Sequence, residues 1–112
     1  MKFLLKILFT TLAVFAGAYL IPGVETESFT VALILAIVLT ILNVTIKPLL
    51  VILTIPITVV TLGLFLLVIN ALIILLADYL VGGFYVSGFW TALLFSIVVS
   101  IMVSIFESFD KD

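Results

Sequence analysis

The fold is decided by the stretch from Asn43 to Asn70, which reads NVTIKPLLVILTIPITVVTLGLFLLVIN. This stretch is too apolar for a soluble loop, yet polar and helix-breaking residues interrupt it too often for one membrane span. The interruptions inside it are Lys47, Pro48, Pro56 and Gly63. Ionisable side chains are costly in lipid, and irregular backbone is tolerated there only at the surface or inside protein. We therefore expect the chain to reverse direction within this stretch.

Composition places the whole chain in a membrane. Hydrophobic residues make up 67% of the 112 residues, charged residues 9%, and the mean hydropathy is +1.68. A soluble domain carries about 25% charged residues, so this surface would not stay in water. The chain contains no histidine, cysteine or arginine, which excludes disulfides and Cys/His metal sites. The net charge of −2 gives no indication of a nucleic-acid partner.

Four apolar segments are long enough to be spans, because a span needs about 20 residues to cross a core of about 30 Å. We expect an all-α integral membrane bundle of four transmembrane helices, forming a single domain over residues 1–112. Residues 47–57 are expected to form a short, proline-punctuated interfacial or re-entrant segment, since Pro56 lacks the amide hydrogen that a helix interior needs. The expected spans are residues 3–21, 28–46, 57–77 and 88–106.

Lysine placement predicts the orientation of these spans. All four lysines fall on one side of the predicted bundle: Lys2, Lys6, Lys47 and Lys111. Glu25, Glu27 and Asp78 fall on the other side, where we interpret Asp78 as a solvated turn residue. The positive-inside rule then places both termini and Lys47 in the cytoplasm of a bacterial cell with the spans in its inner membrane. The tyrosines and the single tryptophan lie near the predicted outer boundary, where amphipathic rings are favoured: Tyr19, Tyr79, Tyr85 and Trp90.

The first span has a second interpretation. Lys2 and Lys6, followed by an apolar run and Ala16-Gly17-Ala18, resemble a secretory signal with a small-residue cleavage site. Cleavage would leave an odd number of spans and release no soluble domain. We therefore favour a first helix that is retained.

Small and polar residues form stripes along three of the predicted spans, as expected where helices pack in lipid. The stripe of the second span is Ala32, Ala36, Thr40, Asn43 and Lys47; that of the third is Gly63, Asn70 and Ala77. The fourth span repeats small residues every four positions, at Gly88, Ala92, Ser96, Ser100, Ser104 and Ser108. Because this period exceeds 3.6, the last stripe drifts by about 40° per step and favours a right-handed crossing.

These stripes have two interpretations. The first is helix packing within one chain, with Asn43 and Asn70 as interhelical hydrogen-bond clamps and Lys47 as a snorkelling charge that sets orientation. The second is a hydrophilic path lined by the serines in an assembly of several copies, because four packed helices leave no water-filled lumen. The sequence indicates the lipid bilayer and further copies of the chain as partners. It indicates no nucleic-acid partner, small-molecule substrate or cofactor.

No catalytic constellation is present in the sequence. The carboxylates lie in loops or at the C-terminal end, and none has a nucleophile, base or metal partner near it in sequence. A phosphate-binding loop would have to follow a strand, and we find no strand pattern. We therefore expect a protein that is not an enzyme and has no catalytic, cofactor-binding or metal-binding residues.

The order of motifs resembles a known family. Asn43-x-x-x-Lys47-Pro48 is followed by Leu53-Thr54-Ile55-Pro56, then Thr61-Leu62-Gly63 and Ile69-Asn70-Ala71, and later by residues 83–93, GFYVSGFWTAL. This order is similar to that of phage holin family 4, superfamily IV, a group of small four-span bacterial proteins. The resemblance covers nearly the whole chain. It implies a holin-like membrane protein, and it implies no catalytic residues.

Two classes of function are consistent with these features. One is a holin-like protein that oligomerises through its small-residue faces and perturbs permeability. The other is a non-conducting scaffold or envelope-stress module that binds other membrane proteins through the same faces. A small transporter is a third hypothesis, because residues 40–43 and 67–70, TILN and LVIN, suggest a weak internal repeat.

Overall fold

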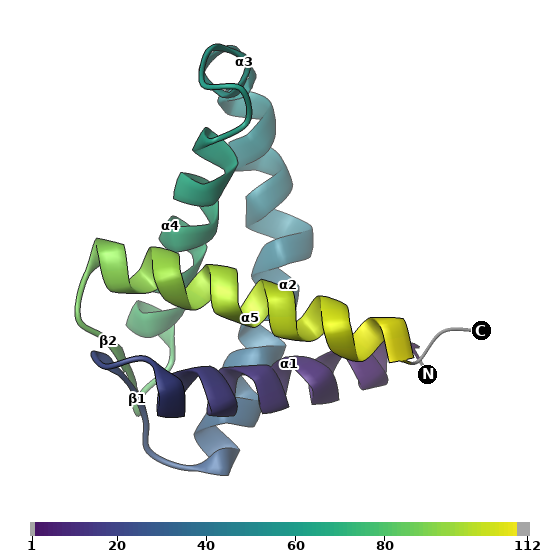
Figure 1. Ribbon diagram of the computed structural model, residues 1–112, viewed down its shortest axis with the longest axis vertical. Coiled ribbons are helices and arrows are strands. Elements are labelled where there is room, and N and C mark those ends of the chain that lie inside the picture. Colours follow the sequence, from purple (N-terminus) through teal and green to yellow (C-terminus); the bar gives the residue numbers. More distant parts are fainter. Residues whose placement is uncertain (1, 110–112) are drawn as a thin grey trace.

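Two helical hairpins with the same plan make up the chain (Figure 1). The computed structural model describes residues 2–109. The first hairpin consists of α1 (Lys2–Leu20), β1 (Val24–Thr26) and α2 (Phe29–Leu53). The second consists of α4 (Phe65–Leu80), β2 (Phe84–Val86) and α5 (Phe89–Phe109). A short helix, α3 (Ile55–Val60), connects them. In each hairpin a three-residue strand therefore lies between two apolar helices.

The two strands pair with each other and join the hairpins at one end. They form an antiparallel ribbon in which Glu25 faces Tyr85 at the centre. The ribbon is extended at both ends by equivalent hydrogen bonds, from Glu27 N to Gly83 O (2.9 Å) and from Ser87 N to Gly23 O (2.8 Å). Gly23 and Gly83 have positive φ angles, of +93° and +90° respectively, which other residues rarely adopt. The expectation that the chain has no strand was wrong, because three-residue strands are too short to show an alternating pattern.

The hairpins are also related in sequence. Residues 19–29, YLIPGVETESF, align with residues 79–89, YLVGGFYVSGF, sixty positions later. The ribbon pairs Val24 with Val86 and Thr26 with Phe84, so a two-fold rotation that exchanges the hairpins maps the ribbon onto itself. The repeat expected from residues 40–43 and 67–70 is therefore not the one that the structure follows.

The helices form two crossing layers, each containing one helix from each hairpin. α1 lies beside α5 in one layer, and α2 lies beside α4 in the other (Figure 1). The molecule measures 39 × 38 × 22 Å, and its smallest dimension fits two helices of about 10–12 Å each. Both layers extend away from the ribbon in different directions, so the molecule is L-shaped, with an inner corner between the layers (Figure 1).

The core lies where the layers cross, close to the ribbon. Its largest fully buried side chains include Leu35 and Phe95, which occupy equivalent places in the two hairpins. Gly17 lies directly against Phe95: a Cβ atom at position 17 would come within 2.9 Å of Phe95 Cε1. The absence of a side chain at Gly17 therefore allows α5 to approach α1 closely.

The proline-rich stretch differs from the prediction. α2 does not end at Lys47 but continues through Pro48 to Leu53, so residues 47–53 belong to a regular helix. Pro48 donates no hydrogen bond to the preceding turn, a loss that membrane helices tolerate because neighbouring groups compensate. The structure therefore does not support a separate segment over residues 47–57.

The chain reverses instead between residues 54 and 64. Thr54 ends α2 and donates its hydroxyl to Leu50 O (2.7 Å). Pro56 lies in the first turn of α3, where its missing N–H has no helical partner to lose. Leu62 and Gly63 then adopt positive φ angles, +57° and +91°, before α4 begins. The helix that corresponds to the third expected span, α4, thus starts at Phe65 rather than at residue 57.

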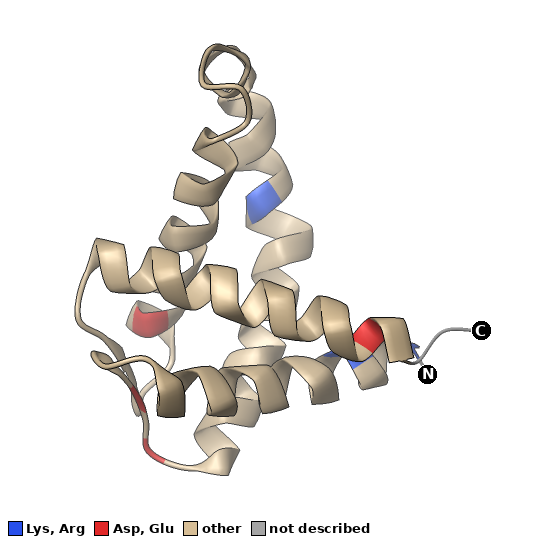
Figure 2. Ribbon diagram, viewed as in Figure 1, with Lys and Arg blue, Asp and Glu red and all other residues tan. Residues whose placement is uncertain are grey.

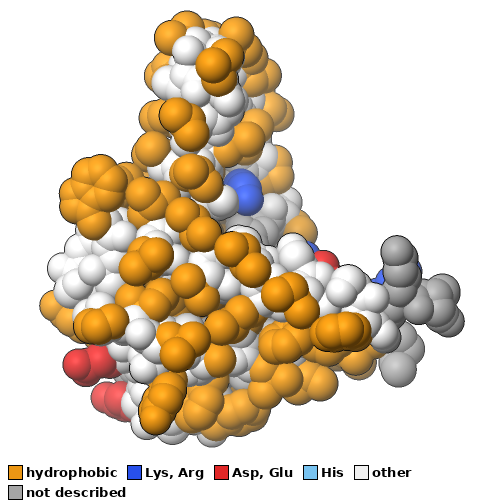
Figure 3. Space-filling model, in the orientation of Figure 1, with side chains coloured by type: hydrophobic (Ala, Val, Ile, Leu, Met, Phe, Trp, Pro, Cys, Tyr) orange, Lys and Arg blue, Asp and Glu red, His pale blue; other side chains and the backbone are white. Residues whose placement is uncertain are grey.

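The surface is that of a membrane protein. α1, α2 and α5 are each long and apolar enough to cross a membrane, and α4 is a shorter apolar helix of 16 residues. At 1.5 Å per residue α4 is about 24 Å long, somewhat less than the hydrocarbon core. Apolar side chains cover most of the face shown in Figure 3. These features describe a helical membrane bundle.

Candidate functional site

A polar cavity of about 250 Å³ lies in the inner corner, where residues from both layers meet. Apolar surface surrounds this corner, in which a basic side chain is visible (Figure 3). α1, α2, α4 and α5 all contribute to the lining. Its polar members are Lys6, Thr10, Thr40, Asn43, Lys47, Asn70, Ser96, Ser100, Ser104 and Glu107. In a chain with so few polar residues, this concentration makes the cavity the candidate functional site.

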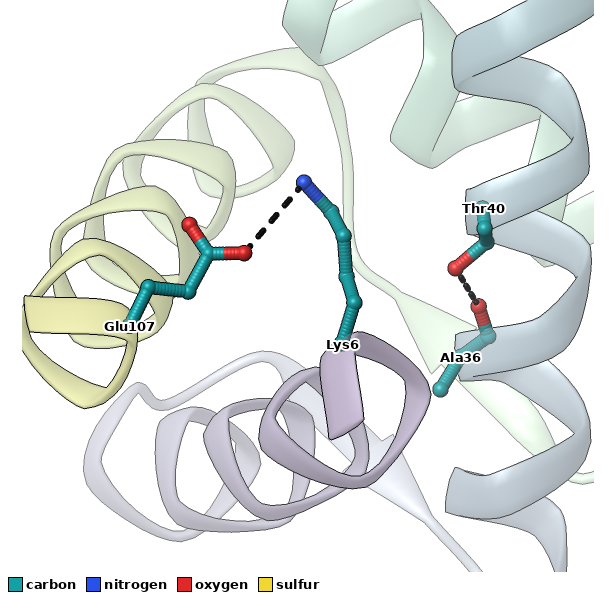
Figure 4. A network of polar contacts seen from close by, with 4 residues as sticks. All are labelled: Lys6, Ala36, Thr40 and Glu107. Carbon is teal, nitrogen blue, oxygen red and sulfur yellow. Dashed lines mark hydrogen bonds and ion pairs between the residues drawn. The ribbon is translucent and has the colours of Figure 1, made fainter. Parts of the chain in front are cut away.

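Two of the three charged residues in the cavity form an ion pair. Lys6 Nζ on α1 lies 3.7 Å from Glu107 Oε2 on α5 (Figure 4). Both side chains are about half exposed, at 47% and 46%, so the pair contributes little stability in water. Lys47 on α2 forms no ion pair with any residue in the range 2–109. The described part of the cavity therefore carries one positive charge in excess.

Two of the three buried hydroxyl groups that line the cavity are bonded to their own helices. Thr40 donates to Ala36 O (2.8 Å, Figure 4), and Ser96 donates to Leu93 O (2.8 Å). Both residues are buried. These bonds satisfy the hydroxyls without a partner from another helix, which fits the usual behaviour of serine and threonine in membrane helices.

The other polar side chains in the cavity are not used within the chain. No side-chain hydrogen bond to another described residue is made by Thr10, Asn43, Asn70, Ser100 or Ser104. The expected clamp by Asn43 and Asn70 is therefore not formed within residues 2–109. Both amides line the cavity instead, where they are available to water or to a ligand.

The predicted stripes of the second and fourth spans each divide into two parts. Near the ribbon, Ala32, Ala36 and Ala92 are buried between helices. Farther from the ribbon, both stripes enter the cavity, through Thr40, Asn43 and Lys47 on α2 and through Ser96, Ser100 and Ser104 on α5. The stripes thus pack between helices near the ribbon and line a polar cavity of the single chain farther from it, and a path through several copies stays a prediction.

The remaining predicted residues lie away from the cavity. Gly63 is in the turn before α4 and shares no helix face with Asn70 and the buried Ala77. Gly88 precedes α5, and a Cβ atom added there would meet nothing within 4 Å. Pro48 is exposed inside α2, and Pro56 is exposed at the start of α3. The helix position expected for Gly63 is therefore not the one observed, whereas Gly88 lies at the N-terminal boundary of α5, where its carbonyl accepts a hydrogen bond from Ala92 N (2.9 Å).

Asp78 was wrongly interpreted as a solvated turn residue. It lies in the last turn of α4, is half-buried, and accepts a hydrogen bond from Val86 N through Oδ2 (3.1 Å). The carboxylate therefore ties α4 to β2. Together with Glu25 and Glu27 it makes the ribbon end acidic (Figure 2).

Three polar residues of the cavity were not predicted from the sequence, namely Lys6, Thr10 and Glu107. Lys6 and Thr10 are four residues apart on α1, and Glu107 follows Ser104 by three residues on α5, so each pair shares a helix face. Extending the stripes to every polar residue would have found these faces. No local spacing could have shown that Lys6 and Glu107 meet.

The residues that line the cavity are suited to binding a ligand or to surrounding a hydrated space. No group of three or more His, Cys, Asp or Glu side chains within residues 2–109 is placed to hold a metal ion. The polar part of the lining contains one carboxylate, paired with Lys6, and otherwise amides, hydroxyls and a second lysine.

Comparison with known proteins identifies the family. The sequence model described as mycobacterial 4 TMS phage holin, superfamily IV, matches residues 1–105. The chain belongs to this family. Its membership and its apolar helices make it a holin-like bacterial membrane protein, as the motifs in the central stretch predicted.

Two bacterial relatives are similar over most of their length. One is the uncharacterized membrane protein YvlD of Bacillus subtilis, 45% identical over 82 residues, which cover 72% of this chain and 69% of the relative. The other is the uncharacterized protein SCO3922 of Streptomyces coelicolor, 40% identical over 94 residues, which cover 80% and 75%. No solved structure matches this holin-family chain.

Proposed function

We propose that this holin-family chain oligomerises in the bacterial inner membrane, with both termini in the cytoplasm, and increases permeability without catalysing a reaction. The observation that carries the proposal is the polar cavity in an otherwise apolar molecule. Polar groups at membrane depth face protein or water, because lipid cannot hydrogen-bond to them. Copies that turn their inner corners toward one another would shield these groups and surround a hydrated space.

Charge distribution supports the proposed orientation. Glu25, Glu27 and Asp78 lie at the ribbon end, whereas Lys2 and Lys6 lie at the opposite end of α1 (Figure 2). The fourth lysine used in the prediction, Lys111, lies outside the described residues. By the positive-inside rule, the lysine end faces the cytoplasm and the ribbon faces outward.

A second candidate is a non-conducting module that binds other membrane proteins. The packing at the ribbon end favours it, because Leu35, Phe84 and Phe95 are buried there and none of them lines the cavity. In a single chain the cavity is therefore closed on the side that faces the ribbon. Conduction would require several copies to provide the outer half of the path.

Potassium release after induced expression separates the two candidates. The wild type should release potassium, and Ser100→Leu should release less because leucine narrows the cavity. Ile101→Phe is the matched control, because Ile101 is 55% exposed on α5 and outside the cavity. Absence of release, with the protein present in the membrane by immunoblot, would favour the non-conducting module.

A further inference from the structure

Five exposed or half-buried polar side chains with unused hydrogen-bond donors point to a ligand in the cavity. Lys47, Asn43, Asn70, Ser100 and Ser104 all line it, and none makes a side-chain hydrogen bond or ion pair with another residue in the range 2–109. They come from α2, α4 and α5, so three helices direct donors into one space. A polar site of this kind at membrane depth is expected to be functional.

The charge of the cavity favours an anion. Glu107 already pairs with Lys6, at 3.7 Å, which leaves the ammonium of Lys47 as the excess charge among the described residues. Lysine binds phosphate as a point charge, and hydroxyls and amides supply further hydrogen bonds to its oxygens. A ligand that accepts many hydrogen bonds and carries negative charge meets both requirements.

The size and the walls of the cavity narrow the class of ligand further. A volume of about 250 Å³ is below the range of about 300–1,000 Å³ that is usual for drug-sized ligands. Part of the wall is apolar, formed by Leu39, Ile73, Ile74, Val99 and Val103. The space thus fits a small anionic group, with room for a less polar portion beside it.

We propose that the cavity binds a phosphate group, either that of an anionic phospholipid headgroup or free phosphate, with Lys47 as the charged contact. Asn43, Asn70, Ser100 and Ser104 complete the contacts to its oxygens. The proposal uses the same cavity as the proposed function and shares its membrane placement. It does not require conduction.

Binding is measured with the purified full-length chain in nanodiscs of zwitterionic phosphatidylcholine. Phosphatidic acid is added to the nanodiscs in one arm, inorganic phosphate to the buffer in another, and only more phosphatidylcholine in a third. Retained lipid is counted by native mass spectrometry, and the thermal unfolding midpoint is followed for all three arms. We expect phosphatidic acid to raise the midpoint and phosphatidylcholine to leave it unchanged. A rise with inorganic phosphate alone would identify free phosphate as the source.

Two lysine variants test the site. Lys47→Gln should weaken phosphate binding about tenfold, as expected for the loss of a charge-assisted contact. Lys2→Gln is the control, because it removes the same charge from an exposed position outside the cavity and should leave binding within about twofold of the wild type. Equal losses in the two variants would mean general attraction to a charged surface and would overturn the proposal. So would the absence of any difference among the three arms.

A second pair of variants covers the case in which Lys47→Gln does not fold. Asn43→Ala and Ser100→Ala each remove a donor from the lining and should each reduce binding several-fold. Unchanged binding in both would overturn the proposal. Potassium release is measured independently on the same variants: binding without release would sustain this proposal and contradict the conducting function, and release without binding would do the reverse.

Discussion

Glu25 and Tyr85 face each other at the centre of the ribbon, and they also occupy equivalent positions in the two hairpins. The approximate two-fold axis therefore passes between them. Each hairpin contributes one strand to the ribbon and one helix to each layer, so neither hairpin could bury its apolar faces in this way alone. The short ribbon thus fixes how four long helices cross.

The hydrogen bond from Val86 N to the Asp78 carboxylate should stabilise the junction between α4 and β2. We expect Asp78→Ala to lower the free energy of unfolding by about 1–3 kcal/mol, because it removes a charged acceptor from a half-buried backbone N–H. Reversible unfolding in detergent, followed by circular dichroism, measures this loss. Glu25→Ala is the control, since Glu25 is exposed and its side chain makes no hydrogen bond to a described residue. Equal effects of the two substitutions would contradict the assigned role.

The contact between α1 and α5 depends on Gly17. Gly17→Ala should destabilise the fold by about 1–3 kcal/mol, because the added methyl group meets the fully buried ring of Phe95 at 2.9 Å. Gly82→Ala should be nearly neutral, since a Cβ atom there meets nothing within 4 Å. Thermal unfolding of the two variants in the same detergent makes the comparison. Adding Phe95→Leu to Gly17→Ala should recover part of the loss, and no recovery would argue against this contact as the cause.

Adjacent members of the serine stripe should respond differently to leucine. Ser96→Leu should cost about 1–3 kcal/mol, because Ser96 is only 5% exposed and the larger side chain overpacks the layer crossing. Ser100→Leu should have little effect on stability, because Ser100 is exposed to the cavity, which can accommodate the side chain. Unfolding midpoints distinguish the two. Similar losses would mean that α5 packs closely along its whole length.

Labelling of single cysteines tests the orientation directly, since the chain has no native cysteine. Glu25→Cys should react with an impermeant thiol reagent in intact cells, whereas Lys2→Cys should react only after the membrane is opened. Both positions are exposed, so differences in reactivity report the side of the membrane. Gly23 is unsuitable for this purpose, because its φ is +93° and a Cβ atom would clash with Ser87 Oγ at 2.6 Å. Labelling of position 2 from outside would contradict the proposed topology.

Several features of the fold could be predicted because they depend on composition and local pattern. The helices expected at residues 3–21 and 88–106 lie at Lys2–Leu20 and Phe89–Phe109. The stretch around Pro48 misled the prediction, because the proline rule comes from helices in water, whereas α2 continues through it.

The cavity could be predicted only in part. The stripes of α2 and α5 indicated polar faces, but whether the faces meet depends on how the layers cross, and that depends on a ribbon of three-residue strands. The ion pair between Lys6 and Glu107 joins the first and last helices. Such a contact depends on the topology of the fold, which the spacing of residues along the sequence does not predict.

The duplicated plan has a consequence for the charges of the cavity. Lys47 and Glu107 are sixty positions apart and thus equivalent in the two hairpins, and both line the inner corner. In a symmetric pair of identical hairpins, one residue type would have to occupy both places, so two like charges would face the same space. Within one chain, position 47 and position 107 can each be substituted without a change at the other. Fusion of the two hairpins therefore permits a cavity that is electrically asymmetric on a scaffold that is nearly symmetric.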